Sequence, residues 1–254
     1  MDDVTHVETR LIASLQQGET KIMKKNKEAI ILAGGFGTRL QGVVKDVPKP
    51  MAPVNDRPFL TYILDYLIEY QYNKVILSVG YLHEKIEEYF GNQYKSLEID
   101  YAVETEPLGT GGGIAYAMSK CSSDNVLVIN GDTMFKVNLT EFEQFFAEKR
   151  CLLSIVLREV EDVSRYGSVT IGNNNMIILF SEKGVSSGRG FINGGVYMIN
   201  RALFDKYPQP KKFSFEKDLM EKYYTRELFF AMPSDGYFID IGIPEDYARA
   251  QNEL

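Results

Sequence analysis

Short apolar runs alternate with amphipathic stretches along the first half of the chain. The runs at residues 29–34, 74–80, 97–104 and 124–132 have the length and apolar content of buried strands. Between them, apolar residues recur at helical spacing and predict helices at 57–72, 82–91, 111–120 and 138–150. Because repeated strand–helix units favour a parallel sheet with helices on both faces, we expect an α/β fold.

The pattern changes after residue 150. Apolar runs separated by short polar turns predict strands at 151–160, 167–172, 176–183 and 191–200. Two further strands, 227–233 and 237–242, accompany helical stretches at 213–224 and 244–254. We therefore expect residues 151–254 to be mixed α+β and to continue the sheet that residues 28–150 begin. Residues 1–27 are polar, and we interpret them as an N-terminal extension that is flexible in part.

Composition and charge exclude several classes of function. The net charge is −7, so no overall positive field favours nucleic acid. With two cysteines and no apolar run long enough to cross a membrane, we expect a cytoplasmic protein without a disulfide framework. Because there are only two histidines, the chemistry must rest on carboxylates, lysines, arginines and backbone amides.

The first predicted strand runs into a glycine-rich turn, "LAGGFGTRL" at residues 32–40. Missing side chains let backbone N–H groups approach phosphate oxygens, and a helix N-terminus adds positive potential. The turn is not a P-loop, because Gly37 is followed by Thr38 and Arg39. It also departs from the dinucleotide pattern, which has a third glycine where Leu40 stands. Taken alone, the turn indicates a phosphate site or a plain tight turn.

Further features favour the phosphate site. Lys49 lies between two prolines, which fix the backbone on both sides and make the lysine a well-placed charge. A second glycine-rich turn at 106–113 follows another strand, and two such turns at the carboxyl ends of neighbouring parallel strands would border a ligand crevice. Asp132 and Asp240 each end an apolar strand, and two carboxylates suit Mg²⁺. Together these features predict a site for a nucleoside triphosphate and Mg²⁺.

The same residues carry a resemblance to a known family. The chain resembles the sugar-1-phosphate nucleotidyltransferases through the ordered motifs "LAGGFGTRL", "PKPM", "EPLGTGG", "NGD", "SEK", "INGGVY" and "FIDIGIPEDY". This resemblance implies a Rossmann-like, mostly parallel mixed sheet of the GT-A-like nucleotidyltransferase type. It implies a nucleotide-binding half at 28–150 and a sugar-phosphate half at 151–254 of the same domain. We expect no C-terminal β-helix of the kind some relatives carry, because the chain is too short for one.

The resemblance also implies a reaction and roles for single residues. The reaction joins a nucleoside triphosphate to a sugar 1-phosphate and releases pyrophosphate, with Mg²⁺ as cofactor. The catalytic residues would be Arg39 and Lys49 on the phosphates and Asp132, which would share Mg²⁺ with Asp240. The nucleotide would be bound by Ala33, Gly34, Gly35, Gly37, Thr38, Glu104, Pro107, Gly109 and Thr110. The sugar phosphate would be bound by Gly167, Glu182, Lys183, Asn193 and Gly194, with Tyr166 beside it.

These residues also have plainer interpretations. A surface lysine at 49, turn-capping aspartates at 132 and 240, a solvated charged pair at 182–183 and a turn asparagine at 193 fit the same sequence. The carboxylate of Glu104 can accept from guanine N1–H and N2–H₂, but uracil N3–H can also donate to it, so Glu104 does not decide the base.

Substrate choice rests on the finer resemblance. The motifs are most similar to members that join GTP to D-glycero-α-D-manno-heptose 1-phosphate, and uridylyltransferases acting on N-acetylmuramate 1-phosphate are close in pattern. A non-catalytic nucleotide-sugar sensor is the alternative of a different class, and a kinase is disfavoured because its signatures are missing. We expect neither nucleic acid nor a membrane as partner, and we expect a homo-oligomer because many relatives self-associate.

Overall fold

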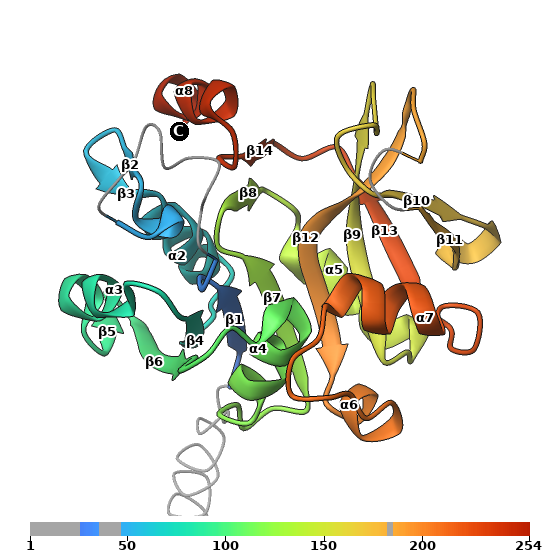
Figure 1. Ribbon diagram of the computed structural model, residues 1–254, viewed down its shortest axis with the longest axis horizontal. Coiled ribbons are helices and arrows are strands. Elements are labelled where there is room, and N and C mark those ends of the chain that lie inside the picture. Colours follow the sequence, from blue (N-terminus) through green and yellow to red (C-terminus); the bar gives the residue numbers. More distant parts are fainter. Residues whose placement is uncertain (1–25, 36–46, 182–184) are drawn as a thin grey trace, which may run out of the picture.

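A single sheet of ten strands organises the residues that the computed structural model describes, which are 26–35, 47–181 and 185–254. At its centre β7 (Asn125–Asn130), β1 (Glu28–Leu32), β4 (Lys74–Val79) and β6 (Leu97–Val103) lie side by side in that order and run parallel. The short β5 (Gln93–Tyr94) pairs antiparallel with β6 at one edge. This centre confirms the α/β prediction (Figure 1).

The second half of the chain continues the same sheet, as predicted. Strand β12 (Gly190–Asn200) pairs antiparallel with β7 and joins the two halves. Beyond it lie β9 (Leu153–Val160), β10 (Ser168–Ile171), β11 (Ile177–Ser181) and β13 (Phe230–Ser234). Of the pairs in this half only β9 with β13 is parallel, so the sheet is parallel in the middle and mixed on this side.

Helices cover both faces of the sheet. The side chain of Ile31 in β1 packs in the core that contains α2 (Phe59–Glu69), α3 (His83–Phe90), α5 (Leu139–Lys149) and α8 (Pro244–Glu253). Its neighbour Ile30 packs in the opposite core, with α4 (Gly109–Met118), α6 (Ala202–Lys206), η3 (Phe215–Met220) and α7 (Glu221–Tyr223). Successive strand residues point to opposite faces, and a continuous apolar run therefore serves two cores.

Local signals account for two ends of the predicted helices, the start of α5 and the end of α3. Asn138 caps α5, since its side-chain oxygen accepts a hydrogen bond from the Glu141 N–H at 3.3 Å. Helix α3 ends at Gly91, whose φ of 57° favours glycine. The sequence did not predict the short elements η1 (Lys49–Met51), β2 (Pro53–Val54), β3 (Arg57–Pro58), β8 (Thr133–Phe135) and η2 (Asn173–Asn175).

The last strand does not join the main sheet. β14 (Phe238–Asp240) instead pairs antiparallel with β8 in a separate two-stranded sheet, with Asp240 opposite Thr133. The rings of Phe135 and Phe238 meet edge to face, with their centroids 5.3 Å apart, and fasten this ribbon. The pairing of β14 with β8 brings Asp240, the last residue of β14, beside Asp132.

The expectation that the two glycine-rich turns follow neighbouring strands is wrong. The turns follow β1 and β6, and β4 lies between these strands. The end of β4 fills the space between the turns, since an added Cβ at Gly34 would lie 3.4 Å from the backbone nitrogen of Gly80. A third segment, beginning at Gly80, therefore contributes to the crevice.

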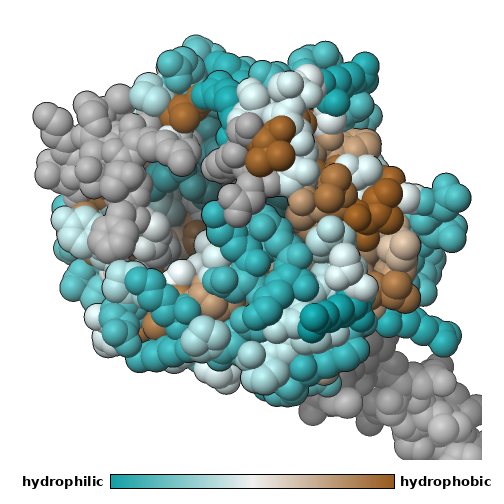
Figure 2. Space-filling view, turned by 45° about the vertical axis from the view of Figure 1, so that its right-hand side comes forward, coloured by the Kyte–Doolittle hydropathy of each residue, from teal (hydrophilic) through white to brown (hydrophobic). Residues whose placement is uncertain are grey.

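Exposed apolar side chains gather on the face that carries β11 and β13. They include Ile178 and Leu179 of β11 and Leu228 before β13, and Figure 2 shows brown side chains together on this side. Such a patch suits contact with another protein surface, and the expected homo-oligomer stays a prediction. None of the helices in the described part of the chain has the length and apolar character needed to cross a membrane.

Candidate active site

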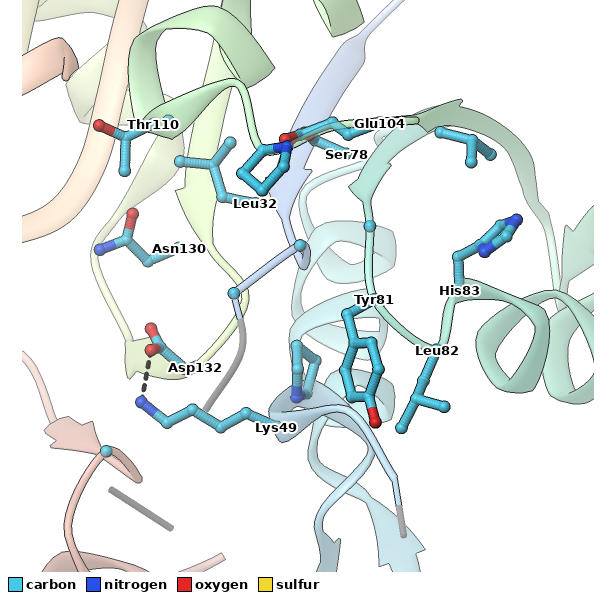
Figure 3. A pocket seen from close by; sticks show the side chains of 18 of the residues that line it. Leu32, Lys49, Ser78, Tyr81, Leu82, His83, Glu104, Thr110, Asn130 and Asp132 are labelled. Carbon is cyan, nitrogen blue, oxygen red and sulfur yellow. Dashed lines mark hydrogen bonds and ion pairs between the residues drawn. The ribbon is translucent and has the colours of Figure 1, made fainter. Parts of the chain in front are cut away.

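A cavity of about 1100 Å³ opens at the carboxyl ends of the central parallel strands. It is where open α/β sheets bind ligands. The residues after β1 lie in the middle of the cavity wall, with Glu104 and Ser78 on one side and Lys49 and Asp132 on the other (Figure 3). Of the residues predicted to bind substrates or metal, the cavity is lined by Gly34, Gly35, Lys49, Glu104, Pro107, Gly109, Thr110, Asp132 and Asp240.

Three distant segments meet at the acidic corner of the cavity. Asp132 lies just beyond β7, Asp240 ends β14, and Lys49 begins η1. The Lys49 Nζ atom lies 2.5 Å from Oδ2 of Asp132 and 3.6 Å from Oδ1 of Asp240. The Ile241 N–H donates to the Asp132 carbonyl at 3.0 Å, and this bond ties the two acidic segments together. The motif-based prediction that these three residues share one site agrees with this geometry.

The electrostatics of this corner suit a cation. Burial raises the pKa of Asp240, and the nearby charge of Asp132 raises it further. The Lys49 ammonium opposes both effects, as does the Gly242 N–H, which donates to Oδ1 of Asp240 at 2.7 Å. Two carboxylates this close repel each other, so the corner is stabilised by any positive charge placed between them.

The carboxylate pair fits a divalent metal. No group of three or more His, Cys, Asp or Glu side chains gathers for a metal anywhere in the described ranges. Mg²⁺ is usually held by only one or two carboxylates, and substrate phosphates and water supply its remaining oxygen ligands. Asp132 and Asp240 provide that donor set, and the open cavity beside them has room for the phosphates.

The first glycine-rich turn is held tightly where it leaves β1. Ala33 is buried, and its N–H donates to the Ser78 carbonyl at 2.8 Å, so Ala33 supports the turn without lining the cavity. Apart from its chain neighbours, no atom of the described residues lies within 4 Å of the position a Gly35 Cβ would take, and Gly35 itself lines the cavity. The predicted residues Gly37, Thr38 and Arg39 lie outside the described residues.

The second glycine-rich turn has a different role from the one expected for most of its glycines. The N–H groups of Gly111 and Gly112, in the first turn of α4, donate to the Phe213 carbonyl at 3.1 and 3.4 Å. An added Cβ at Gly111 would lie 2.1 Å from the Phe213 ring, and one at Gly112 would lie 2.4 Å from the Lys211 carbonyl. Gly111 and Gly112 therefore let residues 211–213 pack closely against the start of α4. Of residues 109–113, only Gly109 and Thr110 line the cavity.

Glu104 lines the cavity, and its carboxylate is already fixed by the protein. Ser78 Oγ donates to Oε1 at 3.1 Å, and the Leu108 N–H donates to Oε2 at 2.9 Å. An added Cβ at Gly113 would lie 2.7 Å from Oε1, so this glycine makes room for the carboxylate. Each carboxylate oxygen has a second lone pair, and Glu104 can therefore still accept hydrogen bonds from a nucleotide base.

Of the residues predicted for the sugar phosphate, those that the structure describes do not line the cavity. Asn193 donates from Nδ2 to the Tyr197 hydroxyl at 2.8 Å and accepts the Gly195 N–H at Oδ1 at 3.0 Å. Gly194 packs against the Phe135 ring, 2.5 Å from an added Cβ. Neither Gly167 nor Asn193 nor Gly194 is a cavity residue. Glu182 and Lys183 lie outside the described residues.

Tyr166, suggested as a neighbour of the sugar, is near the acidic corner. Burial raises the pKa of its phenol, and the charges of Asp240 and Asp246 raise it further. The phenol of Tyr166 therefore senses the charge of Asp240, although Tyr166 does not line the cavity.

The structure adds cavity residues that the sequence did not single out. Asn130 lies at the end of β7 and faces the cavity between Thr110 and Asp132 (Figure 3). Glu216 of η3 also lines the cavity and accepts hydrogen bonds from the hydroxyls of Thr110 at 2.7 Å and Ser214 at 3.1 Å. Asn130 belongs to the "NGD" motif, which could have indicated it. Nothing in the sequence near Glu216 indicates that it reaches the cavity, because its partner Thr110 lies 106 residues earlier in the chain.

Comparisons with known proteins agree with this geometry. The family profile described as Nucleotidyl transferase matches residues 28–254. The D-glycero-alpha-D-manno-heptose 1-phosphate guanylyltransferase of Aneurinibacillus thermoaerophilus is 49% identical over 89% of this chain and 98% of its own length. The protein of the same name from Campylobacter jejuni is 44% identical over 87% of this chain and 96% of its own length.

A solved structure is similar as well. The crystal structure of HddC from Yersinia pseudotuberculosis, complexed with GMP-PN, has 38% sequence identity and a TM-score of 0.79. The match covers 89% of this chain and 99% of that chain. This likeness confirms the predicted nucleotidyltransferase fold.

Proposed function

The chain belongs to the nucleotidyl transferase family, and from this membership we propose that it joins GTP to D-glycero-α-D-manno-heptose 1-phosphate. The products are GDP-heptose and pyrophosphate. The observation that carries the proposal is the 49% identity to a guanylyltransferase of that name, extending over nearly the whole of both chains. The cavity with its acidic corner supports the proposal.

The chemistry is a displacement at the α-phosphorus of GTP. An oxygen of the sugar phosphate attacks, a new P–O bond forms, and the bond to the β-phosphate breaks so that pyrophosphate leaves. This oxygen is already anionic, so no general base is required. The main barrier is the approach of two polyanions, and catalysis consists of positioning and charge neutralisation.

The residues of the corner divide this task. We propose Mg²⁺ as the metal, held by Asp132 and Asp240, which would neutralise charge on the phosphates. Lys49 would neutralise negative charge on the α-phosphate during the displacement. Gly34 and Gly35 would let the backbone approach the nucleotide, and Arg39 would steady the departing pyrophosphate. We place the reaction in the cytoplasm, where nucleoside triphosphates are made.

Recognition of the two substrates is also part of the proposal. Glu104 would accept from guanine through the lone pairs that Ser78 and Leu108 leave open. We keep Gly167, Asn193 and Gly194, with Glu182 and Lys183, as the sugar-phosphate side. The hydrogen bonds of Asn193 to Tyr197 and Gly195 support a positioning role for it in this half of the chain.

The direct test is pyrophosphate release with Mg²⁺. GTP, UTP, dTTP, CTP and ATP would each be offered with heptose, mannose, glucose and N-acetylmuramate 1-phosphates. We expect release with GTP and the heptose phosphate. Release only with UTP and N-acetylmuramate 1-phosphate would keep the reaction class and replace the substrates.

A variant separates an enzyme from a nucleotide-sugar sensor. Asp132→Asn should abolish turnover if the protein is an enzyme whose metal this carboxylate holds, whereas a sensor whose nucleotide binding does not require the metal should keep that binding. Asp100→Asn is the matched control, because Asp100 pairs with surface lysines outside the cavity. Nucleotide binding without release from any substrate pair would favour the sensor.

A further inference from the structure

The Lys49 ammonium occupies the position between the two carboxylates that a metal would need. Its Nζ atom is within ion-pair distance of both Asp132 and Asp240, and its side chain is only 13% exposed. The chain leaves a fitted space for it at Gly242. An added Cβ there would lie 2.7 Å from Nζ and 2.7 Å from Oδ1 of Asp240. The ammonium is therefore seated by the backbone as well as by charge.

This seat answers a physical need of the carboxylate pair. Asp132 and Asp240 both lie within ion-pair distance of the same ammonium, and two carboxylates that share a site repel each other unless a positive charge stands between them. Lys49 offsets that repulsion. The prolines on either side restrict the backbone, so the lysine returns to one place.

We propose that Lys49 is an internal counter-cation that competes with the divalent metal for Asp132 and Asp240 until a triphosphate draws the lysine away. An ammonium and a metal ion cannot both hold the same carboxylate oxygens at close range. Metal binding without nucleotide must therefore break the ion pair. A bound triphosphate gives the ammonium a new anionic partner, so nucleotide and metal strengthen each other's binding, and this coupling is reciprocal.

The inference rests on the proposed function for its nucleotide and metal, but it can be tested without turnover. The affinity for Mn²⁺ alone would be measured from the electron paramagnetic resonance signal of the free ion. In the absence of nucleotide, Lys49→Met should bind Mn²⁺ at least tenfold more tightly than the wild type. Lys27→Met is the matched control, because Lys27 forms a 2.8 Å ion pair with Glu143 and is not a cavity residue. Its affinity should equal that of the wild type.

A second measurement addresses the coupling. A GTP analogue with carbon between the α- and β-phosphorus atoms should tighten Mn²⁺ binding strongly in the wild type and much less in Lys49→Met. Melting curves with and without Mn²⁺ would show that the variant is folded. If the methionine variant does not fold, Lys49→Gln removes the same charge and carries the same expectation.

The outcomes separate this inference from the proposed function. Equal Mn²⁺ affinity in wild type and folded Lys49→Met would overturn the counter-cation role, even if GDP-heptose forms. Tighter binding in the variant, with no product from any substrate pair, would keep the counter-cation role and remove the proposed reaction.

Discussion

Gly111 and Phe213 offer a sharp test of how the second glycine-rich turn is built. The Phe213 side chain is 5% exposed, and its ring stands where a Gly111 side chain would be, 2.1 Å from an added Cβ. The φ of Gly111 is not among the positive values found in the described residues, so its backbone conformation would accept alanine. The three atoms nearest to that Cβ all belong to the Phe213 ring.

The expected effect of Gly111→Ala on the free energy of unfolding changes sign when the Phe213 ring is removed. In the wild type, Gly111→Ala forces the ring or the 211–213 segment to move, which costs about 1–3 kcal/mol. Alanine has a higher helix propensity than glycine, and this difference offsets up to about 1 kcal/mol of that cost. Phe213→Ala by itself should cost about 3–5 kcal/mol, because it empties a buried ring site. Once the ring is gone, Gly111→Ala should stabilise the protein by up to about 1 kcal/mol.

Urea unfolding of the wild type, both single variants and the double variant measures this cycle. The chain has no tryptophan, so the transition would be followed by far-ultraviolet circular dichroism. We expect a coupling free energy of about 1–3 kcal/mol between the two sites. If Gly111→Ala lowers the urea midpoint equally in both backgrounds, the ring is not the obstacle and the packing argument fails.

Three further predictions follow from single contacts. Asp240→Asn should lower kcat/KM by about 10²–10³-fold while the melting temperature changes little, because it removes a carboxylate proposed to hold Mg²⁺ on the reacting phosphates; a loss of activity explained by a lower melting temperature would contradict this. Glu104→Gln should reduce the preference for GTP over UTP by about 1–3 kcal/mol, measured as the ratio of the two kcat/KM values, and an unchanged ratio would remove Glu104 from base recognition. Burial raises the pKa of Glu28, but hydrogen bonds from Ser123 and Ser122 outweigh it and hold the pKa below 4.5. The stability that this carboxylate contributes is therefore present above about pH 4.5 and lost as the pH falls below it. Glu28→Gln should lower the urea midpoint at pH 7, and the difference from the wild type should shrink in acid; a difference that persists in acid would show that the charge is not responsible.

Segments whose structure depends on adjacent residues were predicted well. The run at 124–132 predicted β7 because a strand buried on both faces needs only a short apolar stretch. The stretch at 138–150 predicted α5 because its period and its Asn138 cap are local signals. Motif order also grouped Lys49, Asp132 and Asp240; the structure brings their side chains together, and their roles stay a prediction.

The path of the chain between those segments was not predictable in the same way. The sequence of the strands does not show that β4 separates the two glycine-rich turns, because strand order depends on how helices cross the sheet. Nor does it show that Gly111 and Gly112 serve Phe213 and Lys211, about 100 residues away. A glycine looks the same whether it admits a phosphate or a neighbouring backbone.

The amino-acid sequence by itself therefore determined the elements, the family and the chemical groups of the corner, since these reside in local periodicity and in motif residues. The tertiary structure alone decided which groups touch. It paired β14 with β8, placed the Lys49 ammonium between two carboxylates, and brought Glu216 to Thr110. These contacts join residues tens to more than a hundred positions apart, and they form only when the packing of both cores has fixed the course of the backbone.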